Sequence, residues 1–326
     1  MNKQPDLEDI RRAHQRISSV IHRTPVLTCT AINRMVGARL FFKCENFQKV
    51  GAFKFRGACN AIFSLTDKEA SRGVITHSSG NHAAALALAA RTRGIPARIV
   101  MPSNAPPVKI AAVKGYGGII TFCEPTLMAR ETTAKEVIDK TGAMFIHPYN
   151  DYRIIAGQGT AALELMEEIN NLDFILAPVG GGGLLSGTAI AAKSLKPEIK
   201  VIGCEPKNAD DAFRSKRAGK IIPSKNPNTI ADGLKTSLGD KTFPIIMDLV
   251  DEIVLSTEEE IVDGMRTIFE RMKIVIEPSS AVPLAALLSN KLDVKGKNVG
   301  IILSGGNVDL SKFFERIIRP EQREEK

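Results

Sequence analysis

Short apolar runs alternate with helical stretches along nearly the whole chain, and this alternation constrains the fold more than any other feature. One example is "ARIVMP" (residues 97–102), followed by a helical stretch at 106–117; another is "KVIGCEP" (200–206), which follows a helical stretch at 184–195. Strands that alternate with helices indicate a parallel sheet, because the chain returns to each next strand through a helix. The sequence therefore predicts an α/β fold.

The order of these units also indicates two domains. Residues 73–149 form one self-contained run of strands and helices, and further α/β units flank this run on both sides. The order predicts a small substrate-binding domain, 73–149, inserted into a larger discontinuous cofactor-binding domain, 1–72 and 150–326. We expect the ligand in the cleft between them.

Composition narrows the classes of partner. The 326 residues carry a net charge of +8, but the lysines and arginines are spread along the chain and are not interleaved with aromatic residues. We therefore expect no nucleic-acid partner, whereas the charge suits a small anionic ligand. The polar N-terminus and the lack of a run of about 18 apolar residues predict neither a signal peptide nor a membrane span. Five cysteines without a C-x-x-C pair indicate a reducing compartment, so the expected location is cytoplasmic.

Lys54 stands out because phenylalanines flank it in the segment "GAFKFRGA". Burial disfavours the ammonium form and lowers the pKa of a lysine, and a neutral lysine amine is the nucleophile of Schiff-base chemistry. The alternative is a surface lysine whose stem packs on phenylalanine while its amine reaches water. This segment alone leaves both interpretations open.

A run of four glycines, Gly180 to Gly183, joins a strand to a helix in "APVGGGGLLSG". Glycine leaves backbone N–H groups unobstructed and a helix N-terminus attracts anions, so the loop is typical of a phosphate site. A Walker loop is excluded because Leu184 follows the last glycine. A dinucleotide fingerprint lacks its third glycine, since that place is taken by Ser186, yet Glu205 ends a strand where a nicotinamide enzyme has an acidic residue. An NAD-dependent oxidoreductase therefore stays an alternative, although it gives Lys54 no role.

Three further segments place polar groups where strands end. In "LSGGN", a buried strand ends at Ser304, a place where ligands bind in α/β proteins. In "CEPKNADD", Glu205, Asp210 and Asp211 form an oxygen-rich set suited to Mg²⁺ or Ca²⁺, although a solvated acidic loop has the same composition. In "THSSGNH", hydroxyl, amide and backbone N–H groups at a strand-to-helix junction are suited to a carboxylate. The residues of that junction are Ser78, Ser79, Gly80, Asn81 and His82.

Together, "GAFKFRGA", "SSGNH", the glycine run and "SGGN" resemble the fold-type II pyridoxal-phosphate enzymes, in particular the serine/threonine dehydratase and serine racemase group. The resemblance extends from about residue 7 to residue 312, and the four motifs are highly specific in this order. It implies a tryptophan synthase β-like fold with two open parallel-sheet α/β domains and the active site in the cleft between them. It also implies pyridoxal 5'-phosphate as the cofactor.

The resemblance assigns roles to single residues. Lys54 would hold the cofactor as a Schiff base and remove the substrate α-proton on its own face, and Phe53 would pack on the pyridine ring. Asn81 would bond the phenolic oxygen of the cofactor, and Ser304 would face the pyridine nitrogen. A serine there does not enforce a protonated ring, which suits β-elimination of water. The cofactor phosphate would lie on Gly180, Gly181, Gly182, Gly183 and Leu184.

Two features are similar to the serine racemase branch of the group. "EPKNADD" resembles its divalent-cation site, with Mg²⁺, Ca²⁺ or Mn²⁺ on Glu205, Asp211 and the backbone carbonyl of Ala209. Catabolic threonine dehydratases generally lack these carboxylates and usually carry alanine where this chain has Ser79. Ser79 would be the second acid–base group, on the face opposite Lys54, as racemisation requires.

The chain also departs from the branch. Mammalian members have Gly-Gln where Ala83 and Ala84 follow the "SSGNH" segment, so activation by ATP does not carry over directly. Tyr149 replaces an asparagine in the segment after "HP". Hydroxyaspartate dehydratases are similar as well, and in that case Arg130 would hold a second substrate carboxylate.

These features imply a cytoplasmic homodimer that takes a small amino-acid substrate. The implied activity is interconversion of L- and D-serine together with dehydration of L-serine to pyruvate and ammonia. An L-threonine or L-threo-3-hydroxyaspartate dehydratase on the same scaffold is the nearest alternative. The NAD-dependent oxidoreductase and a non-catalytic amino-acid-binding protein are the others.

Overall fold

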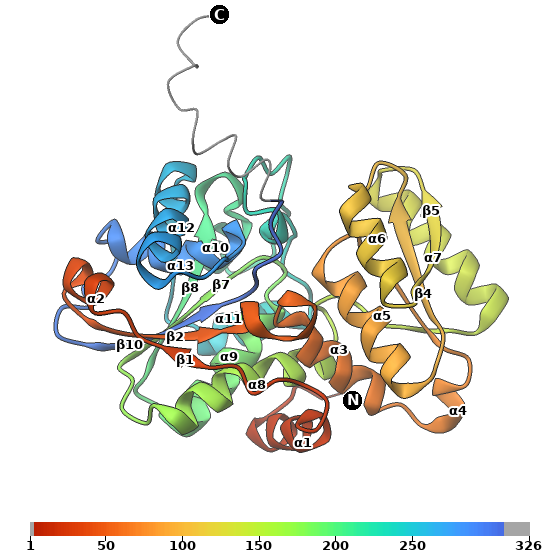
Figure 1. The fold of residues 1–326 in the computed structure, drawn as a ribbon, viewed down its shortest axis with the longest axis horizontal. Coiled ribbons are helices and arrows are strands. Elements are labelled where there is room, and N and C mark those ends of the chain that lie inside the picture. The colour runs from red at the N-terminus through yellow and green to blue at the C-terminus, as the bar shows by residue number, and fades with distance from the viewer. Residues whose placement is uncertain (1–2, 310–326) are drawn as a thin grey trace, which may run out of the picture.

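The computed structural model describes residues 3–309, which form two bodies lying side by side (Figure 1). The larger body is built on a six-stranded sheet with the strands, in spatial order, β1 (Val26–Leu27), β2 (Arg39–Cys44), β10 (Asn298–Leu303), β7 (Phe174–Pro178), β8 (Lys200–Pro206) and β9 (Glu252–Ser256). The smaller body has a four-stranded sheet in the order β5 (Ile119–Cys123), β4 (Ala97–Pro102), β3 (Val74–His77) and β6 (Met144–Phe145).

Both sheets are parallel, apart from one edge. Within residues 3–309, each neighbouring pair of these strands runs parallel except β1 and β2, which are antiparallel. The first part of the chain and its last strand meet in the sheet, because β10 lies between β2 and β7. The predicted α/β class with two open parallel sheets is confirmed.

The helices cover both faces of the larger sheet and surround the smaller one (Figure 1). Those of the larger body are α1 (Leu7–Ile17), α2 (Thr30–Val36), α8 (Tyr152–Glu168), α9 (Gly183–Leu195), α10 (Asp211–Ala218), α11 (Thr242–Leu249), α12 (Glu258–Met272) and α13 (Pro278–Leu288). The remaining α-helices are α3 (Lys54–Phe63), α4 (Asp67–Ala70), α5 (Asn81–Arg93), α6 (Pro107–Gly115) and α7 (Leu127–Thr141). Short 3₁₀ turns occur at η1 (Glu45–Phe47), η2 (Lys49–Gly51), η3 (Lys207–Ala209) and η4 (Asp232–Leu234).

Local sequence explains where several helices begin and end. The helix α12 starts with a capping box between Thr257 and Glu260. The helix α5 ends at Gly94, whose φ of 75° is the left-handed conformation that glycine adopts at low cost. These signals depend on a few neighbouring residues, so they can be read without knowledge of the tertiary structure.

The core of the larger body lies on both faces of its sheet. Ile302 of β10 packs into a cluster with α1, α8, α9 and α11, whereas Ile301 and Leu303 pack into a second cluster with α2, α12 and α13. This alternation follows from the two-residue period of a strand. Because β10 is buried on both faces, its end is held in a fixed place.

The helix α3 lies where the two bodies meet (Figure 1). Phe55 and Ile62 of α3 share a core cluster with Leu86 and Ile99 of the smaller body. On its other side α3 approaches α8 so closely that a Cβ at position 157 would lie 2.6 Å from the Cα of Gly57. Gly157 of α8 therefore lets the backbones of the two helices come into contact. The helix α3 is packed between the two bodies.

The strands of the smaller sheet all come from within residues 73–149. The domain limits at 72/73 and 149/150 stay a prediction, and residues 310–326 of the larger predicted domain lie outside the described residues. Between residues 3 and 309, the structure contains no helix with the length and apolar character to cross a membrane.

Candidate active site

The predicted motifs follow the carboxyl ends of neighbouring strands. In the larger sheet, Ser304 follows β10, the glycine run follows β7, and the acidic segment begins at the end of β8. In the smaller sheet, Ser78 follows β3. Ligands of open α/β sheets bind outside these strand ends. The fold therefore places residues that are scattered through the sequence at the carboxyl ends of strands in its two sheets.

Lys54 is the first residue of α3 and follows a tight turn. In this turn Val50 has a φ of 58° and Gly51 a φ of 68°, and Ala52 pairs with Gly305 just beyond β10. A left-handed backbone is uncommon for a β-branched residue such as valine, so tertiary contacts must hold the turn. The turn fixes the start of α3 against the end of β10.

The amine of Lys54 is partly buried and has no carboxylate partner among residues 3–309. Its Nζ donates a hydrogen bond to the carbonyl of Pro148 at 2.8 Å and lies 5.1 Å from the centre of the Phe53 ring. Burial lowers the pKa of Lys54 to about 8, and the charge of Glu277 partly opposes this effect. At pH 7 roughly a tenth of such amines are neutral, as a nucleophile requires.

The glycine loop meets the N-terminus of α9. The N-cap is Gly182, with a φ of 87°, and no side chain caps this helix end. The first N–H groups of α9 are therefore available to an anion. A Cβ at Gly181 would lie 2.4 Å from the ring of Tyr149, so the loop needs glycine where the aromatic ring covers it. The hydroxyl of Thr242 donates to the Gly181 carbonyl at 2.8 Å and holds the loop from its other side.

The two ends of the loop are also confined. A Cβ at Gly180 would lie 2.9 Å from the Cα of Leu234, and one at Gly183 would lie 3.0 Å from the Cβ of Tyr149. Leu184 is only 5% exposed and packs into the core beneath α9. The loop is thus a closely packed cradle and not a flexible connection.

Ser304 is almost fully buried directly after β10. Its Oγ lies 3.1 Å from the Oγ of Ser280, and Ser304 is the donor because the single hydroxyl hydrogen of Ser280 goes to the Gly305 carbonyl. Ser280 also donates to the Gly305 carbonyl and accepts from the Gly305 N–H, both at 2.7 Å. The helix α13 therefore fixes the strand end that presents Ser304.

Asn81, the first residue of α5, reaches from the smaller body to the larger one. Its Nδ2 donates to Oε2 of Glu277 at 2.9 Å, and its Oδ1 accepts from Nδ2 of Asn307 at 2.9 Å. Burial raises the pKa of Glu277 to about 7, and the hydrogen bond from Asn81 opposes this shift. Sequence reasoning missed Glu277, whose only local signal is its place before Pro278 at the start of α13.

The serine segment before α5 is partly exposed. Ser78 Oγ accepts a hydrogen bond from the Gly80 N–H at 3.3 Å, and no hydrogen bond of the Ser79 hydroxyl occurs within the described part of the chain. His82 is 2% exposed, and its Nε2 lies 3.3 Å from the carbonyl of Ile146. Burial holds the pKa of His82 well below 6.5, so the ring is neutral at pH 7. The substrate-binding role of this segment stays a prediction.

Arg130 lies in the first turns of α7, where its Nε donates to the carbonyl of Thr126 at 3.4 Å. Burial lowers the pKa of His77, and the charge of Arg130 lowers it further. Because His77 immediately precedes Ser78, the charge of Arg130 acts close to the predicted substrate segment. Its contact with a substrate carboxylate stays a prediction.

The acidic segment after β8 contains two buried carboxylates. Both oxygens of Glu205 accept backbone N–H groups at 2.9 Å, from Ala212 and Phe213 at the start of α10. Asp211 Oδ2 accepts from the Leu238 N–H at 3.2 Å, whereas Asp211 Oδ1 is buried without a hydrogen-bond partner. An orphaned carboxylate oxygen in this position is suited to a cation.

The two buried carboxylates of this segment, Glu205 and Asp211, are suited to a divalent cation with oxygen ligands. Burial raises the pKa of Asp211 to about 7 and that of Glu205 well above its usual range, and Asp211 adds to the shift of Glu205. Asp210, in contrast, pairs with Arg214 at 2.7 Å. Within residues 3–309 no three His, Cys, Asp or Glu side chains form a metal cluster. Ala209, whose backbone carbonyl is the predicted third ligand, is buried in η3, and its role as a ligand stays a prediction.

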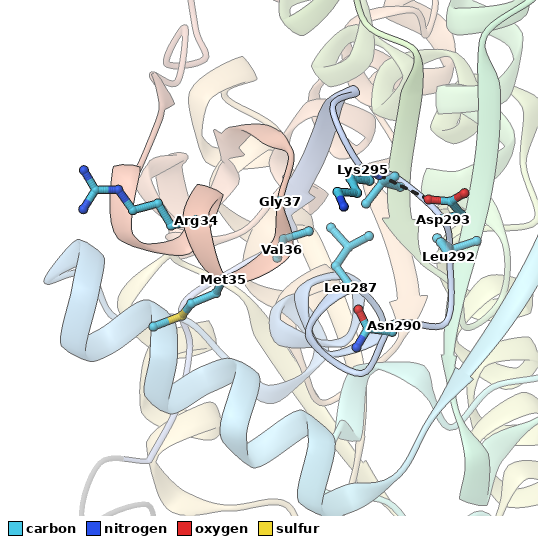
Figure 2. A pocket seen from close by; sticks show the side chains of 10 residues that line it. Arg34, Met35, Val36, Gly37, Leu287, Asn290, Leu292, Asp293 and Lys295 are labelled. Carbon is cyan, nitrogen blue, oxygen red and sulfur yellow. Dashed lines mark hydrogen bonds between the residues drawn. The ribbon is translucent and has the colours of Figure 1, made fainter.

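A cavity of about 390 Å³ lies away from all these motifs (Figure 2). It borders the end of α2 and the turn that leads into β10, so it is at the amino end of this strand, whereas Ser304 follows the carboxyl end. Figure 2 shows the side chain of Arg34 directed away from Leu287 and Asn290. The cavity is not part of the candidate site.

Comparison with known proteins decides the family. The model of the family described as "Pyridoxal-phosphate dependent enzyme" matches residues 17–305. The chain belongs to this family. It is 55% identical to the serine racemase of Arabidopsis thaliana over 95% of both chains, and 53% identical to the beta-hydroxyaspartate dehydratase of Paracoccus denitrificans over 95% of this chain and 98% of that protein. The solved structure of maize serine racemase superposes with a TM-score of 0.94 at 50% identity, covering 97% of this chain and 98% of that chain.

The family predicted from the four motifs is therefore confirmed, with its fold, its cofactor and its enzymatic nature. The residues described above fit pyridoxal phosphate. The N-terminus of α9 lacks a capping side chain, so its N–H groups are available to the cofactor phosphate. Lys54 has a lowered pKa and no ion-pair partner among the described residues. The relatives above give no support to the NAD-dependent oxidoreductase.

Proposed function

We propose that this pyridoxal-phosphate enzyme interconverts L- and D-serine and also removes water from L-serine to give pyruvate and ammonia. The proposal is supported by two candidate acid–base groups on separate elements: Lys54 begins α3, and Ser79 lies two residues before α5, whose first residue, Asn81, reaches Glu277 of the larger body. Racemisation requires two acid–base groups, because a single group returns the proton to the face that it left. The similarity to serine racemases over nearly the whole chain supports the same activity.

Each residue has a part in this reaction. Bound pyridoxal phosphate supplies the electron sink that makes the substrate α-proton acidic. The amine of Lys54, with its lowered pKa, accepts or returns the proton on one face, and the hydroxyl of Ser79 does so on the other. The N–H groups at the start of α9 hold the phosphate, and Ser304 and Asn81 hold the ring. The backbone and hydroxyls of residues 78–82 bind the substrate carboxylate.

The proposal includes a divalent cation, Mg²⁺, Ca²⁺ or Mn²⁺, on Glu205, Asp211 and the carbonyl of Ala209. The buried, unpartnered Oδ1 of Asp211 supports it. A homodimer in the cytoplasm also belongs to the proposal, and light scattering of the purified protein tests the dimer. ATP is an additional candidate effector, and its addition to the assay below tests it.

A second candidate is dehydration of L-threo-3-hydroxyaspartate. It is favoured by the charge of Arg130 beside the substrate segment, because that substrate carries a second carboxylate. The identity of 53% with a beta-hydroxyaspartate dehydratase supports it as well. L-threonine dehydration, a third possibility on the same scaffold, has no such observation in its favour.

One assay separates these activities. Purified enzyme with Mg²⁺ is incubated with L-serine, L-threonine or L-threo-3-hydroxyaspartate, and chiral chromatography of the amino acid is combined with an assay of the 2-oxo acid. We expect D-serine and pyruvate from L-serine. Turnover of 3-hydroxyaspartate without any D-serine would favour the second candidate, and no turnover of L-serine would contradict the proposal. Lys54→Ala is the inactive control.

A further inference from the structure

Asn307 connects two parts of the site that the sequence motifs present as separate. Its Nδ2 donates to the carbonyl of Val50 at 2.7 Å and to Oδ1 of Asn81 at 2.9 Å. Val50 belongs to the left-handed turn before Lys54, and Asn81 starts α5 in the smaller body. One side-chain amide therefore touches the support of the lysine and the residue that faces the cofactor ring.

We propose that Asn307 is a positioning residue, which fixes the amide orientation of Asn81 and the turn that carries Lys54. This inference rests on the proposed role of Asn81 as a hydrogen-bond donor to the cofactor. Asn307 would act through Asn81 and Val50, without touching the reacting atoms.

The hydrogen-bond partners determine which way both amides face. The carbonyl of Val50 can only accept, so the NH₂ end of Asn307 must point toward it. That leaves the second N–H of Asn307 for Asn81, whose oxygen must then face Asn307. The carboxylate of Glu277 also only accepts when ionised, so the NH₂ end of Asn81 must face Glu277. Two independent constraints thus give Asn81 the same orientation.

This orientation decides what Asn81 can offer to a ligand. Its oxygen is occupied by Asn307, and its Nδ2 lies 2.9 Å and 3.2 Å from the two carboxylate oxygens of Glu277. When one N–H group is shared between these two oxygens, the other N–H group is left for a ligand. A phenolic oxygen with negative charge needs a donor, and charge-assisted hydrogen bonds are the stronger ones. With the amide reversed, Asn81 would present an oxygen to that group and repel it.

The turn before Lys54 is shaped to fit Asn307. A Cβ at Gly51 would lie 2.7 Å from Oδ1 of Asn307, and the φ of Gly51 is 68°. The backbone closes the same contact, since the Gly306 N–H donates to the Gly51 carbonyl at 2.9 Å. Asn307 therefore holds the unfavourable backbone conformation of the turn from one side.

The test uses Asn307→Asp, which keeps the shape of the side chain and removes both donors. Cofactor-free protein is titrated with pyridoxal phosphate, and binding is followed by absorbance, with the melting temperature measured in parallel. We expect the dissociation constant to rise by at least about tenfold, the value of a single net hydrogen bond. Asn46→Ala is the control, because the side chain of Asn46 donates a hydrogen bond to the Val275 carbonyl and, among the described residues, makes none to Asn81 or to residues 50 and 51. Its cofactor affinity should stay within about twofold of the wild type.

A double variant, Asn307→Asp with Glu277→Gln, separates orientation from general damage. Here the reversed amide of Asn81 is satisfied, since the new carboxylate at position 307 accepts from its NH₂ end and the new amide at position 277 donates to its oxygen. We expect the melting temperature to recover part of the loss seen in Asn307→Asp, while cofactor affinity stays low. Recovery of both together, or unchanged affinity in Asn307→Asp, would overturn the inference. Neither readout needs turnover, so failure of the proposed function shows itself separately, as wild-type enzyme that binds the cofactor without converting serine.

Discussion

Lys43 is fully buried and Lys54 is partly buried, and their surroundings give the two lysines different chemistry. Lys43 Nζ donates to Glu164 and to the Thr24 carbonyl, both at 2.7 Å. Burial lowers the pKa of each lysine, but at Lys43 the charge of Glu164 opposes this directly. Lys54 has only a backbone carbonyl as its hydrogen-bond partner among the described residues. Lys43 therefore has a structural role, and Lys54 is available as a nucleophile.

The lowered pKa of Lys54 predicts how attachment of the cofactor depends on pH. The neutral fraction of the amine increases as the pH rises through about 8, so the rate of pyridoxal-phosphate attachment to cofactor-free protein should rise with a midpoint near 8. Between about pH 8 and 10.5, Lys54 binds fewer protons in the native state than in the unfolded chain. The contribution of Lys54 to the free energy of unfolding therefore increases as the pH rises through this range. Stopped-flow absorbance measures the rate. A rate that rises only near pH 10.5, or attachment that persists in Lys54→Ala, would be inconsistent with this environment.

At the scale of elements, a buried network of charges fixes α3 to its neighbours. The guanidinium of Arg56, two residues after Lys54, donates to both oxygens of Glu45 on η1 and both oxygens of Glu164 on α8, at 2.7–2.8 Å. Lys43 of β2 pairs with the same Glu164. The network therefore sets the position of the helix that begins at Lys54.

Glu164→Gln should destabilise the protein strongly. Removing one partner of a buried ion pair leaves uncompensated charge, at a cost of about 3–5 kcal/mol. Glu167→Gln on the same helix is the matched control, because its pair with Arg23 is exposed and such pairs are worth about 0–1 kcal/mol. Urea unfolding of the two variants gives the comparison. Equal losses of stability in both would contradict the structural role of the network.

These elements also show what the sequence could predict. The glycine run, the "SSGNH" segment and Lys54 have strong local patterns, and the alternation of strands and helices is enough for the parallel sheets. Glu277 and Asn307 belong to the site through contacts with Asn81, which lies far away in the sequence. In the sequence, Arg56 likewise resembles an ordinary charged residue, because its partner Glu164 comes from the distant helix α8. Long-range pairing of polar groups has no local signature. The motifs "SGGN" and "GAFKFRGA" therefore contain Asn307 and Arg56 without indicating their roles, and Glu277 is missed altogether.

At the scale of the whole molecule, the predicted cation site is linked to the cofactor site. Asp211 accepts from the Leu238 N–H, the adjacent Gly239 N–H donates to Thr242 at 2.9 Å, and Thr242 donates to the Gly181 carbonyl at 2.8 Å. A cation on Asp211 would thus order the segment that also holds the glycine loop.

Mg²⁺ should therefore raise the melting temperature of the wild-type protein, and a chelator should reverse the effect. Asp211→Asn should lose this response, because a neutral amide binds Mg²⁺ poorly. Asp210→Asn should keep it, since Asp210 is paired with Arg214 and takes no part in the site. Differential scanning calorimetry compares the three proteins. An equal response in all of them would place the cation elsewhere.

The central claim, two acid–base groups for one proton, is tested most directly by Ser79→Ala. The wild type and the variant are incubated with L-serine and separately with D-serine, with chiral chromatography for serine and an assay for pyruvate in the same samples. We expect that the variant keeps pyridoxal phosphate and still forms pyruvate from L-serine, while the formation and the consumption of D-serine both collapse. Unchanged formation of D-serine by Ser79→Ala, or an equal loss of racemisation and dehydration, would contradict the assignment of Ser79 as the second acid–base group.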